Sequence, residues 1–397
     1  MNRKVKAIKI QNGHVKCCRF RVSGFSFLDK IRTVSSSILL TCNMKRTTRN
    51  LNLTIRNPLS PMPNYILVGL SLFSLLFFPP NSRGQGLDER NFRQSRMIMG
   101  TSVEITVSQT HSQRAEEAMA AAFREVERID LLMSHYRPES EVSQITRQAG
   151  EKETQVSPET LEVVERALYF SRLSGGAFDI TIGPVFGLWN FREGKIPEEK
   201  SLQENLKKVD YRKIKVDRAK SSVYLESRGM ELDLGAIAKG YAVDRASAVL
   251  RKEGVENFLV KAGGDLAVSG AKGNGVAWTI GIQHPRLPSE LIGKLRPSQA
   301  AVATSGDYEK FFFRGGERYH HILTPSTGLP ARECQSVTIL APSAMDADAL
   351  ATSIFVLGPK KGFALLEHFP DVQAIIVDRR GSVLLSPRWP AGLLSPP

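Results

Sequence analysis

Two oxygen-bearing side chains stand one helical turn apart near the C-terminal end of the chain. Asp348 and Thr352 lie in the run Met345–Thr352, and at helical spacing they share one face. Hard oxygen ligands of this kind suit Mg²⁺, which keeps several waters and bridges to substrate phosphates. A carboxylate near a helix start is also a common helix cap, so the pair by itself leaves a metal site and a cap as alternatives.

The segment Glu231–Asp244 predicts a strand that passes into a helix. The small residues Gly235 and Ala236 let another group approach the backbone, and the amides at a helix N-terminus attract anions such as a pyrophosphate. Asp233 and Lys239 would frame that site. The alternative is ordinary packing with a surface ion pair.

Three further segments combine glycine, hydroxyl and imidazole groups. The double glycine Gly263-Gly264 allows amides to face a ligand, although taken alone it favours a simple hairpin turn. The segments Ala303–Tyr308 and His320–Gly328 are hydroxyl-rich, so they could hold phosphate oxygens or place a proton carrier near a leaving group. Of the two adjacent histidines we expect His321 to take part, with a purely structural His321 as the alternative.

Hydrophobic periodicity predicts the elements that position these residues. Alternation and short apolar runs predict five strands, and helical spacing predicts four helices. The predicted strands are 103–107, 258–261, 278–282, 336–340 and 374–377. The predicted helices are 118–133, 158–173 with Ser157 as N-cap, 236–252 and 347–356. Their alternation predicts an α/β (α+β) chain with a mixed sheet flanked by helices, and periodicity gives no strand order.

The positive charge lies at one end of the chain. The net charge is +14, yet residues 1–86 hold 14 Lys and Arg residues against one acid, Asp29, which leaves 40 bases and 39 acids for the rest. A nearly neutral body argues against nucleic acid as the partner, because proteins that bind it concentrate basic residues on the folded domain.

The same end carries a predicted export signal. The apolar run Tyr65–Phe78 is too short to span a bilayer and fits a secretory h-region, with a cleavage zone up to residue 86. Because Met44 and Met62 precede it, we expect the basic leader 1–64 to be untranslated in part or removed; an uncleaved anchor is the alternative. This predicts an exported protein, periplasmic or on the periplasmic side of the inner membrane. Beyond the leader Cys334 is the only cysteine, and we expect it to be a small residue of the core.

Nine segments, in this order and spacing, resemble the ApbE family of FAD:protein FMN transferases over Met99–Gly362. No one of them is specific, but the ordered set is. They are Met99-Gly100-Thr101, Met133–Tyr136 with Ser140-Glu141, Phe178–Thr181 with Gly183-Pro184, Asp233–Gly240, Gly263-Gly264-Asp265, Ile282–Pro285, Thr304–Gly306, His321–Gly328 and Asp348–Thr352.

The resemblance implies one catalytic domain at 96–385 with T-fold-like halves, FAD as substrate, Mg²⁺, and an acceptor protein that receives FMN on a Thr or Ser hydroxyl. It implies a set of FAD contacts: Met99, Tyr136, Phe178, Asp179, Asp233, Lys239, Thr304, Ser305, His321 and Leu323. The metal would be held by the Ala236 carbonyl with Asp348 and Thr352. His321 and Asp307 are the candidate bases, and a membrane redox subunit is the expected acceptor.

Two positions depart from the family pattern. His135 stands where a small or hydroxyl residue is expected, and Thr146 stands where asparagine is usual, so the ring pocket is expected to differ in detail. Tyr136 is the candidate for stacking on a flavin or adenine ring, and its alternative role is a core aromatic at a strand edge. Two other functions remain open: an FAD pyrophosphatase that uses water in place of the acceptor hydroxyl, and a flavin-storage protein without turnover.

Overall fold

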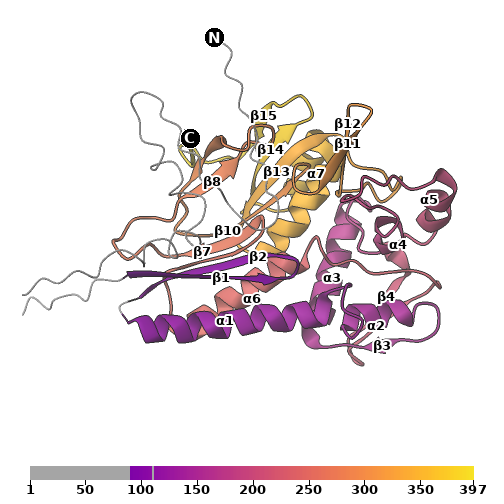
Figure 1. The fold of residues 1–397 in the computed structure, drawn as a ribbon, viewed down its shortest axis with the longest axis horizontal. Coiled ribbons are helices and arrows are strands. Elements are labelled where there is room, and N and C mark those ends of the chain that lie inside the picture. Colours follow the sequence, from indigo (N-terminus) through magenta and orange to yellow (C-terminus); the bar gives the residue numbers. More distant parts are fainter. Residues whose placement is uncertain (1–89, 110) are drawn as a thin grey trace, which may run out of the picture. The chain divides into compact units, whose positions relative to one another are not determined.

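The computed structural model describes residues 90–109 and 111–397, all of which fall in one structural unit. The predictions made for residues 1–64 and 65–86 lie outside the described residues. Figure 1 shows the arrangement of the elements discussed below.

A sheet of eight strands forms the centre of the described unit, in the order β1-β2-β6-β7-β10-β13-β14-β15. Every neighbouring pair in it runs antiparallel. The strands are β1 (Arg90–Ile98), β2 (Thr101–Gln109), β6 (Phe258–Ala262), β7 (Asp265–Ser269), β10 (Gln299–Gly306), β13 (Cys334–Ala341), β14 (Gln373–Asp378) and β15 (Val383–Leu385).

Helices cover one face of this sheet and build the main core. α1 (Ser112–Met133) lies beside α6 (Ala238–Lys252), and α7 (Ala344–Leu366) packs on α6 and on strands β10 and β13 (Figure 1). The alternate side chains of β2 that point toward the helices, Val103 and Ile105 among them, are fully buried, as the period of two predicts.

A small sheet covers part of the opposite face. It runs in the order β16-β9-β8, with β8 (Ile280–Gln283), β9 (Leu291–Leu295) and β16 (Leu394–Ser395). Val302 packs in this second cluster while its neighbours Ala301 and Ala303 pack on the helix side. The two faces of β10 therefore look into different layers.

The remaining elements attach around this centre. The helices are α2 (Glu141–Arg147), α3 (Pro158–Leu173), α4 (Gly183–Phe186), α5 (Glu199–Leu206) and the short η1 (Tyr211–Lys213). A three-stranded sheet consists of β3 (Thr154–Gln155), β5 (Ser222–Leu225) and β4 (Ile214–Asp217), and a hairpin consists of β11 (Phe311–Arg314) and β12 (Glu317–His320).

The predicted fold class is confirmed, and the strand directions need a correction. The chain is α/β with helices on a sheet, but the eight-stranded sheet is antiparallel throughout, in place of the mixed sheet expected. The predicted helices and strands all exist, and the ends of most of them are shifted. The largest shifts are those of a helix expected at 347–356 that occupies Ala344–Leu366 and of a helix expected at 118–133 that occupies Ser112–Met133.

Within the described residues, α7 is the one helix long and apolar enough to cross a membrane. More than half of its most apolar window is buried against the rest of the fold, which is the pattern of a core helix. Gly358 has a non-helical backbone and precedes Pro359, so the helix is kinked there. The part before the kink carries Asp348 and Thr352.

Candidate active site

A buried lysine between two buried carboxylates lies at the centre of the candidate site. Lys239, in the first turn of α6, places its Nζ 2.8 Å from Asp265 Oδ2 and 3.0 Å from Asp348 Oδ2. It also donates to the Gly235 carbonyl at 3.1 Å. The contact to Asp265 is electrostatic rather than a directed hydrogen bond, since Asp265 Oδ2 has no partner in hydrogen-bond geometry among the described residues.

The charges of these three groups depend on one another. Burial and the nearby Asp348 carboxylate raise the pKa of Asp265 to about 7, against the opposing effect of Lys239. Burial alone would favour a neutral lysine, but the carboxylates of Asp265 and Asp348 raise the pKa of Lys239 above its ordinary value. The site therefore holds a positive charge in a place where two anionic groups are buried.

Asp348 is fixed from two sides. The backbone N–H of Gly240 donates to its Oδ2 at 3.2 Å, and Thr352, one turn later, has its hydroxyl 3.1 Å from that of Ser305. This approach needs glycine, because a Cβ at position 240 would stand 2.1 Å from the Ala344 carbonyl oxygen. The predicted pair Asp348 and Thr352 is thus brought beside Lys239 and Ser305.

Asp244 holds the start of α7 against α6. Its carboxylate accepts hydrogen bonds from the Ser343 hydroxyl at 2.7 Å and from the N–H groups of Ala344 at 2.8 Å and Met345 at 2.9 Å. A carboxylate at a helix N-terminus is favoured by the dipole as well as by these bonds. This cap fixes the rotation of α7, and with it the direction of Asp348.

The two predicted hydroxyl residues of β10 separate. Ser305 faces α7, whereas the Thr304 hydroxyl lies 2.9 Å from that of Thr338 on the neighbouring strand. Successive side chains of a strand point to opposite faces, and Val302, two positions before Thr304, packs toward the small sheet. The structure brings the Ser305 side chain, and not that of Thr304, to the Lys239 cluster.

Donors suited to Mg²⁺ meet at this cluster. In the described part of the chain no group of three or more His, Cys, Asp or Glu residues could hold a metal by itself. Here, however, the Lys239 ammonium lies between Asp265 and Asp348 and contacts the Gly235 carbonyl, and the Thr352 hydroxyl lies one helical turn from Asp348. Ala236 follows Gly235, whose carbonyl contacts the same ammonium. Such a donor set fits Mg²⁺, which uses few carboxylates together with water and substrate phosphate.

The aromatic side of the site is exposed. Tyr136 is 73% exposed, and its ring centroid lies 3.8 Å from that of His135. The alternative role of a core aromatic for Tyr136 is therefore wrong. His135 Nδ1 lies 3.4 Å from Asp233 Oδ1, which also accepts from the Gly235 N–H at 2.7 Å. Burial opposes ionisation of Asp233, but these two partners lower its pKa.

Phe178 and Asp179 serve the local fold through their side chains. Phe178 is 2% exposed and packs in the main core. Asp179 accepts from the N–H and hydroxyl of Thr181 at 2.8 and 2.6 Å and from the N–H of Tyr211 at 3.0 Å. Burial raises its pKa despite these bonds. Any contact of Phe178 with a ligand would have to use its backbone.

Met99 lies at the tip of the β1–β2 hairpin. Met99 and Gly100 both have positive φ, 54° and 68°, as a two-residue turn that matches strand twist requires. The following residue, Thr101, approaches Gly263 so closely that a Cβ there would lie 2.9 Å from its hydroxyl. The hairpin tip is thereby placed next to the double glycine that precedes Asp265.

The two adjacent histidines have different surroundings. His320 is buried, with its Nε2 2.8 Å from the Ala331 carbonyl. His321 Nδ1 is buried without a hydrogen-bond partner among the described residues, and burial with the nearby Lys310 lowers the pKa of His321 to about 3. Leu323 is 6% exposed and packs against Trp189, so its side chain belongs to a local core.

Asp307 stands apart from the Lys239 cluster. Both of its carboxylate oxygens lie 2.7 Å from the guanidinium of Arg286. A bidentate arginine engages both oxygens of a carboxylate. The candidate base Asp307 is therefore engaged in an ion pair.

This geometry agrees with the family that the sequence resembles. A family model described as the ApbE family matches residues 99–376. The chain belongs to the ApbE family.

Proteins similar to this ApbE-family chain match it over most of its length and support that membership. An FAD:protein FMN transferase of Treponema pallidum (strain Nichols) is 36% identical over 311 residues, which cover 72% of this chain and 84% of that protein. The crystal structure of the ApbE protein from Thermotoga maritima matches with a TM-score of 0.69 and 35% identity over 75% of this chain and 97% of that chain. The flavin transferase ApbE from Vibrio cholerae matches with a TM-score of 0.67 and 29% identity over 75% and 96%.

Sequence reasoning about this ApbE-family chain assigned no role to three side chains that the structure places at or next to the candidate site. Asp265 lies in one of the nine segments without a function of its own, although a carboxylate that opens an apolar strand signals a buried charge with a partner. Asp244, at the end of the segment Glu231–Asp244, likewise has no predicted function. His135 is a departure from the family pattern in the sequence, and the structure pairs it with Asp233.

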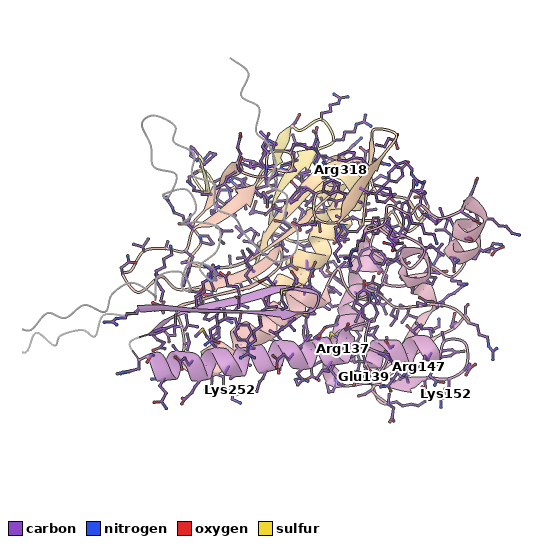
Figure 2. The ribbon with its side chains drawn as sticks, viewed as in Figure 1. Arg137, Glu139, Arg147, Lys152, Lys252 and Arg318 are labelled. Atoms are coloured by element: carbon purple, nitrogen blue, oxygen red, sulfur yellow. The ribbon has the colours of Figure 1, made fainter. Side chains whose placement is uncertain are left out.

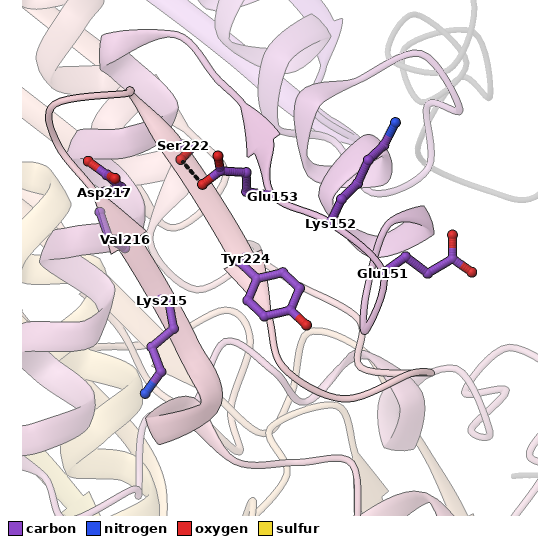
Figure 3. A pocket seen from close by; sticks show the side chains of 8 residues that line it. All are labelled: Glu151, Lys152, Glu153, Lys215, Val216, Asp217, Ser222 and Tyr224. Atoms are coloured by element: carbon purple, nitrogen blue, oxygen red, sulfur yellow. Dashed lines mark hydrogen bonds between the residues drawn. The ribbon is translucent and has the colours of Figure 1, made fainter.

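A cavity of about 370 Å³ lies away from this cluster, on the sheet β3-β5-β4 (Figure 3). Its lining mixes both charges: Glu151, Lys152, Glu153, Lys215, Val216, Asp217, Ser222 and Tyr224. Glu153 accepts a hydrogen bond from Ser222 at 3.0 Å. None of the predicted site residues lines it, and acids and lysines are mixed along it, so we assign it no part in flavin binding.

Proposed function

We propose that this ApbE-family chain is an FAD:protein FMN transferase. It splits FAD at the pyrophosphate, attaches the FMN half to a Thr or Ser hydroxyl of an acceptor protein and releases AMP. The observation that carries the proposal is the buried Lys239 ammonium between Asp265 and Asp348, beside the Ser305 and Thr352 hydroxyls, in a family whose relatives bear that name.

In this proposal the ends of FAD contact different parts of the site. The exposed ring of Tyr136, supported by His135, offers a surface for stacking an aromatic ring of the ligand. The Lys239 ammonium and the Ser305 hydroxyl face the region where a pyrophosphate would lie. Lys239 thereby positions and neutralises the phosphates.

Asp348, Thr352 and the Ala236 carbonyl would hold Mg²⁺. When bound there, Mg²⁺ would neutralise the charge that develops on the pyrophosphate as AMP leaves. Lys239 already shows that the position accepts a cation, and Asp265 adds a second anionic group to it. The Asp244 cap keeps α7 in the orientation that aims Asp348 at the cluster.

His321 is the better supported of the two candidate bases. Its Nδ1 is buried without a partner among the described residues, while both oxygens of Asp307 are held by Arg286. The low pKa of free His321 keeps it neutral at physiological pH, and the negative charge of bound FAD would raise that pKa toward the working range.

The transfer step conserves atoms and electrons. The acceptor hydroxyl oxygen attacks the FMN phosphorus, and its proton passes to His321. The bond from that phosphorus to the bridging oxygen breaks, and the AMP phosphate leaves with the bond's electron pair.

Intact-mass measurement tests the proposal. The chain is incubated with FAD, Mg²⁺ and a candidate acceptor, and the acceptor is weighed. An FMN-sized mass gain with equal AMP release supports transfer; steady AMP release without that gain would favour the pyrophosphatase alternative. Asp348→Ala should abolish AMP release. If the wild type and this variant both bind FAD equally and neither forms a product, the flavin-storage alternative is favoured.

We also propose that the protein is exported and acts on the periplasmic side of the inner membrane, on a membrane redox subunit. The support is the sequence of residues 1–86, with its basic leader and its apolar run. N-terminal sequencing of the protein recovered from periplasmic and membrane fractions tests it. A start between residues 79 and 90 supports cleavage, whereas recovery of the intact N-terminus from the cytoplasm would contradict export.

A further inference from the structure

A second, smaller cavity of about 140 Å³ lies beside the hairpin β11–β12. It is formed where the loop after β8, the end of β10, the start of β13 and the turn after β14 meet. Nine residues line it: Arg286, Asp307, Arg318, His320, Ala331, Arg332, Cys334, Gln335 and Arg379. Figure 2 labels Arg318 at this hairpin. Except for Asp307, none of these residues belongs to the predicted flavin site.

The lining carries an excess of positive charge. It contains four arginines and one carboxylate, and that carboxylate, Asp307, is occupied by Arg286. Arg332 lies 3.4 Å from Glu317 and Arg379 lies 4.0 Å from Glu333, and both glutamates are exposed. Exposed pairs of this kind offset little charge.

Arg318 has the least compensated charge of the four. In the part of the chain that the structure describes, its side chain makes one hydrogen bond, from Nη1 to the Asp307 carbonyl at 3.4 Å, and no ion pair. A guanidinium carries five N–H donors, so most of its donors are available. The ring centroids of Phe311 and Phe313 lie 3.9 and 4.9 Å from its central carbon, and these rings hold it in place.

Two further observations indicate what kind of ligand would fit. Burial lowers the pKa of Arg318, the nearby Asp307 carboxylate opposes this effect, and the Arg286 cation adds to it, so the guanidinium charge is only partly compensated. Gln335 donates from Nε2 to the Arg379 carbonyl at 3.3 Å, while its Oε1 is buried without a partner among the described residues. A ligand that carries both negative charge and a hydroxyl would satisfy both groups.

The size of the cavity excludes larger ligands. Sites for nucleotides and drug-sized molecules occupy about 300–1,000 Å³. A space of about 140 Å³ cannot enclose FAD or AMP, but it can hold one tetrahedral ion.

We propose that this arginine cavity binds a compact, partly protonated oxyanion of the hydrogen phosphate type. Arg318 and Arg332 supply donors to its oxygens, and Gln335 accepts from its hydroxyl. The cavity is separate from the Lys239 cluster, because neither Lys239 nor its partners Asp265 and Asp348 line it.

Calorimetric titration of the full chain with sodium phosphate tests the proposal, at constant ionic strength and with sodium chloride as the reference. We expect one saturable site. Arg318→Gln should weaken phosphate binding about tenfold or more, since a charge-assisted bond contributes about that much. Arg314→Gln is the matched control, because Arg314 belongs to the same hairpin, is exposed and does not line the cavity.

Arg332→Gln provides a second test if Arg318→Gln fails to fold, as judged by circular dichroism. No saturable heat with phosphate, an equal heat with chloride, or equal weakening by Arg314→Gln would overturn the proposal. The titration needs neither FAD nor an acceptor. Its failure is therefore distinguishable from a failure of the transferase proposal.

Discussion

At the scale of single residues, Lys239 holds two buried carboxylates together at the candidate site. Its removal in Lys239→Met leaves two buried carboxylates without their cation, so the free energy of unfolding should fall by about 3–5 kcal/mol at neutral pH. Urea denaturation measures this, and Mg²⁺ should restore part of the loss. Lys252→Met, at the exposed end of the same helix, is the control. Equal losses in the two variants would contradict the assignment.

The buried histidines predict how stability depends on pH. Burial lowers the pKa of His320 to about 4 and of His321 to about 3, so the unfolded chain binds more protons than the folded chain between these values and about pH 6.5. The resulting stability is complete above pH 6.5 and is lost as the pH falls. Between pH 7 and pH 5 each of these two histidines should lower the free energy of unfolding by about 1–2 kcal/mol.

Urea denaturation of His321→Gln at pH 7 and pH 5 checks this expectation. On acidification the free energy of unfolding should fall less in the variant than in the wild type, and the difference should equal the contribution of one histidine. His368→Gln, which alters an exposed histidine, should behave as the wild type does. An unchanged drop in His321→Gln would show that His321 is not the source.

Residue types and their order along the chain predict much of the candidate site, and side-chain direction limits the rest. Asp348 and Thr352 share a helix face as their spacing predicts, and Lys239 meets Asp348 as the family resemblance implies. Thr304 turns to the opposite face from Ser305, because a strand alternates, and the sequence does not say which parity faces the helices. Asp265 is hard to recognise in the sequence because its partner, Lys239, is 26 positions earlier in the chain.

At the scale of elements, the approach of α6 to α7 sets the geometry of the site. Gly240→Ala would place a methyl group 2.1 Å from the Ala344 carbonyl oxygen and push the helices apart. We expect a loss of about 1–3 kcal/mol in unfolding free energy and a larger relative loss of FMN transfer, because Asp348 moves away from Lys239.

Thermal denaturation and the acceptor mass assay measure the two effects. Ala248→Ser also adds one heavy atom to α6, at an exposed position, and should change neither. Transfer at the wild-type rate in Gly240→Ala would show that this helix contact does not position the proposed metal ligands.

The existence of strands follows from the sequence more readily than their direction. The alternation of β2 and the apolar run of β14 predict both strands, with ends shifted by a few residues. Direction depends on how connections cross the sheet, and β2 pairs with β6, a strand far along the chain. Local periodicity carries no information about such distant pairing, so it cannot distinguish the expected mixed sheet from the antiparallel sheet that exists.

At the scale of the whole molecule, the described unit contains every side chain assigned to flavin chemistry. A chain reduced to residues 87–397 should therefore keep the kcat/KM of the full chain for FMN transfer, within about twofold. The mass assay on both forms measures it. A large loss in the shorter form would mean that residues 1–86 contribute to the reaction directly.

The antiparallel pairing of distant strands has a consequence for when activity first arises. Lys239, Asp265, Ser305 and Asp348 come from four separate segments, and the last, α7, lies near the C-terminal end. Contacts of such long sequence separation form slowly and late in folding. A chain still being synthesised therefore lacks an assembled site. FAD is protected from the nascent enzyme until folding is complete.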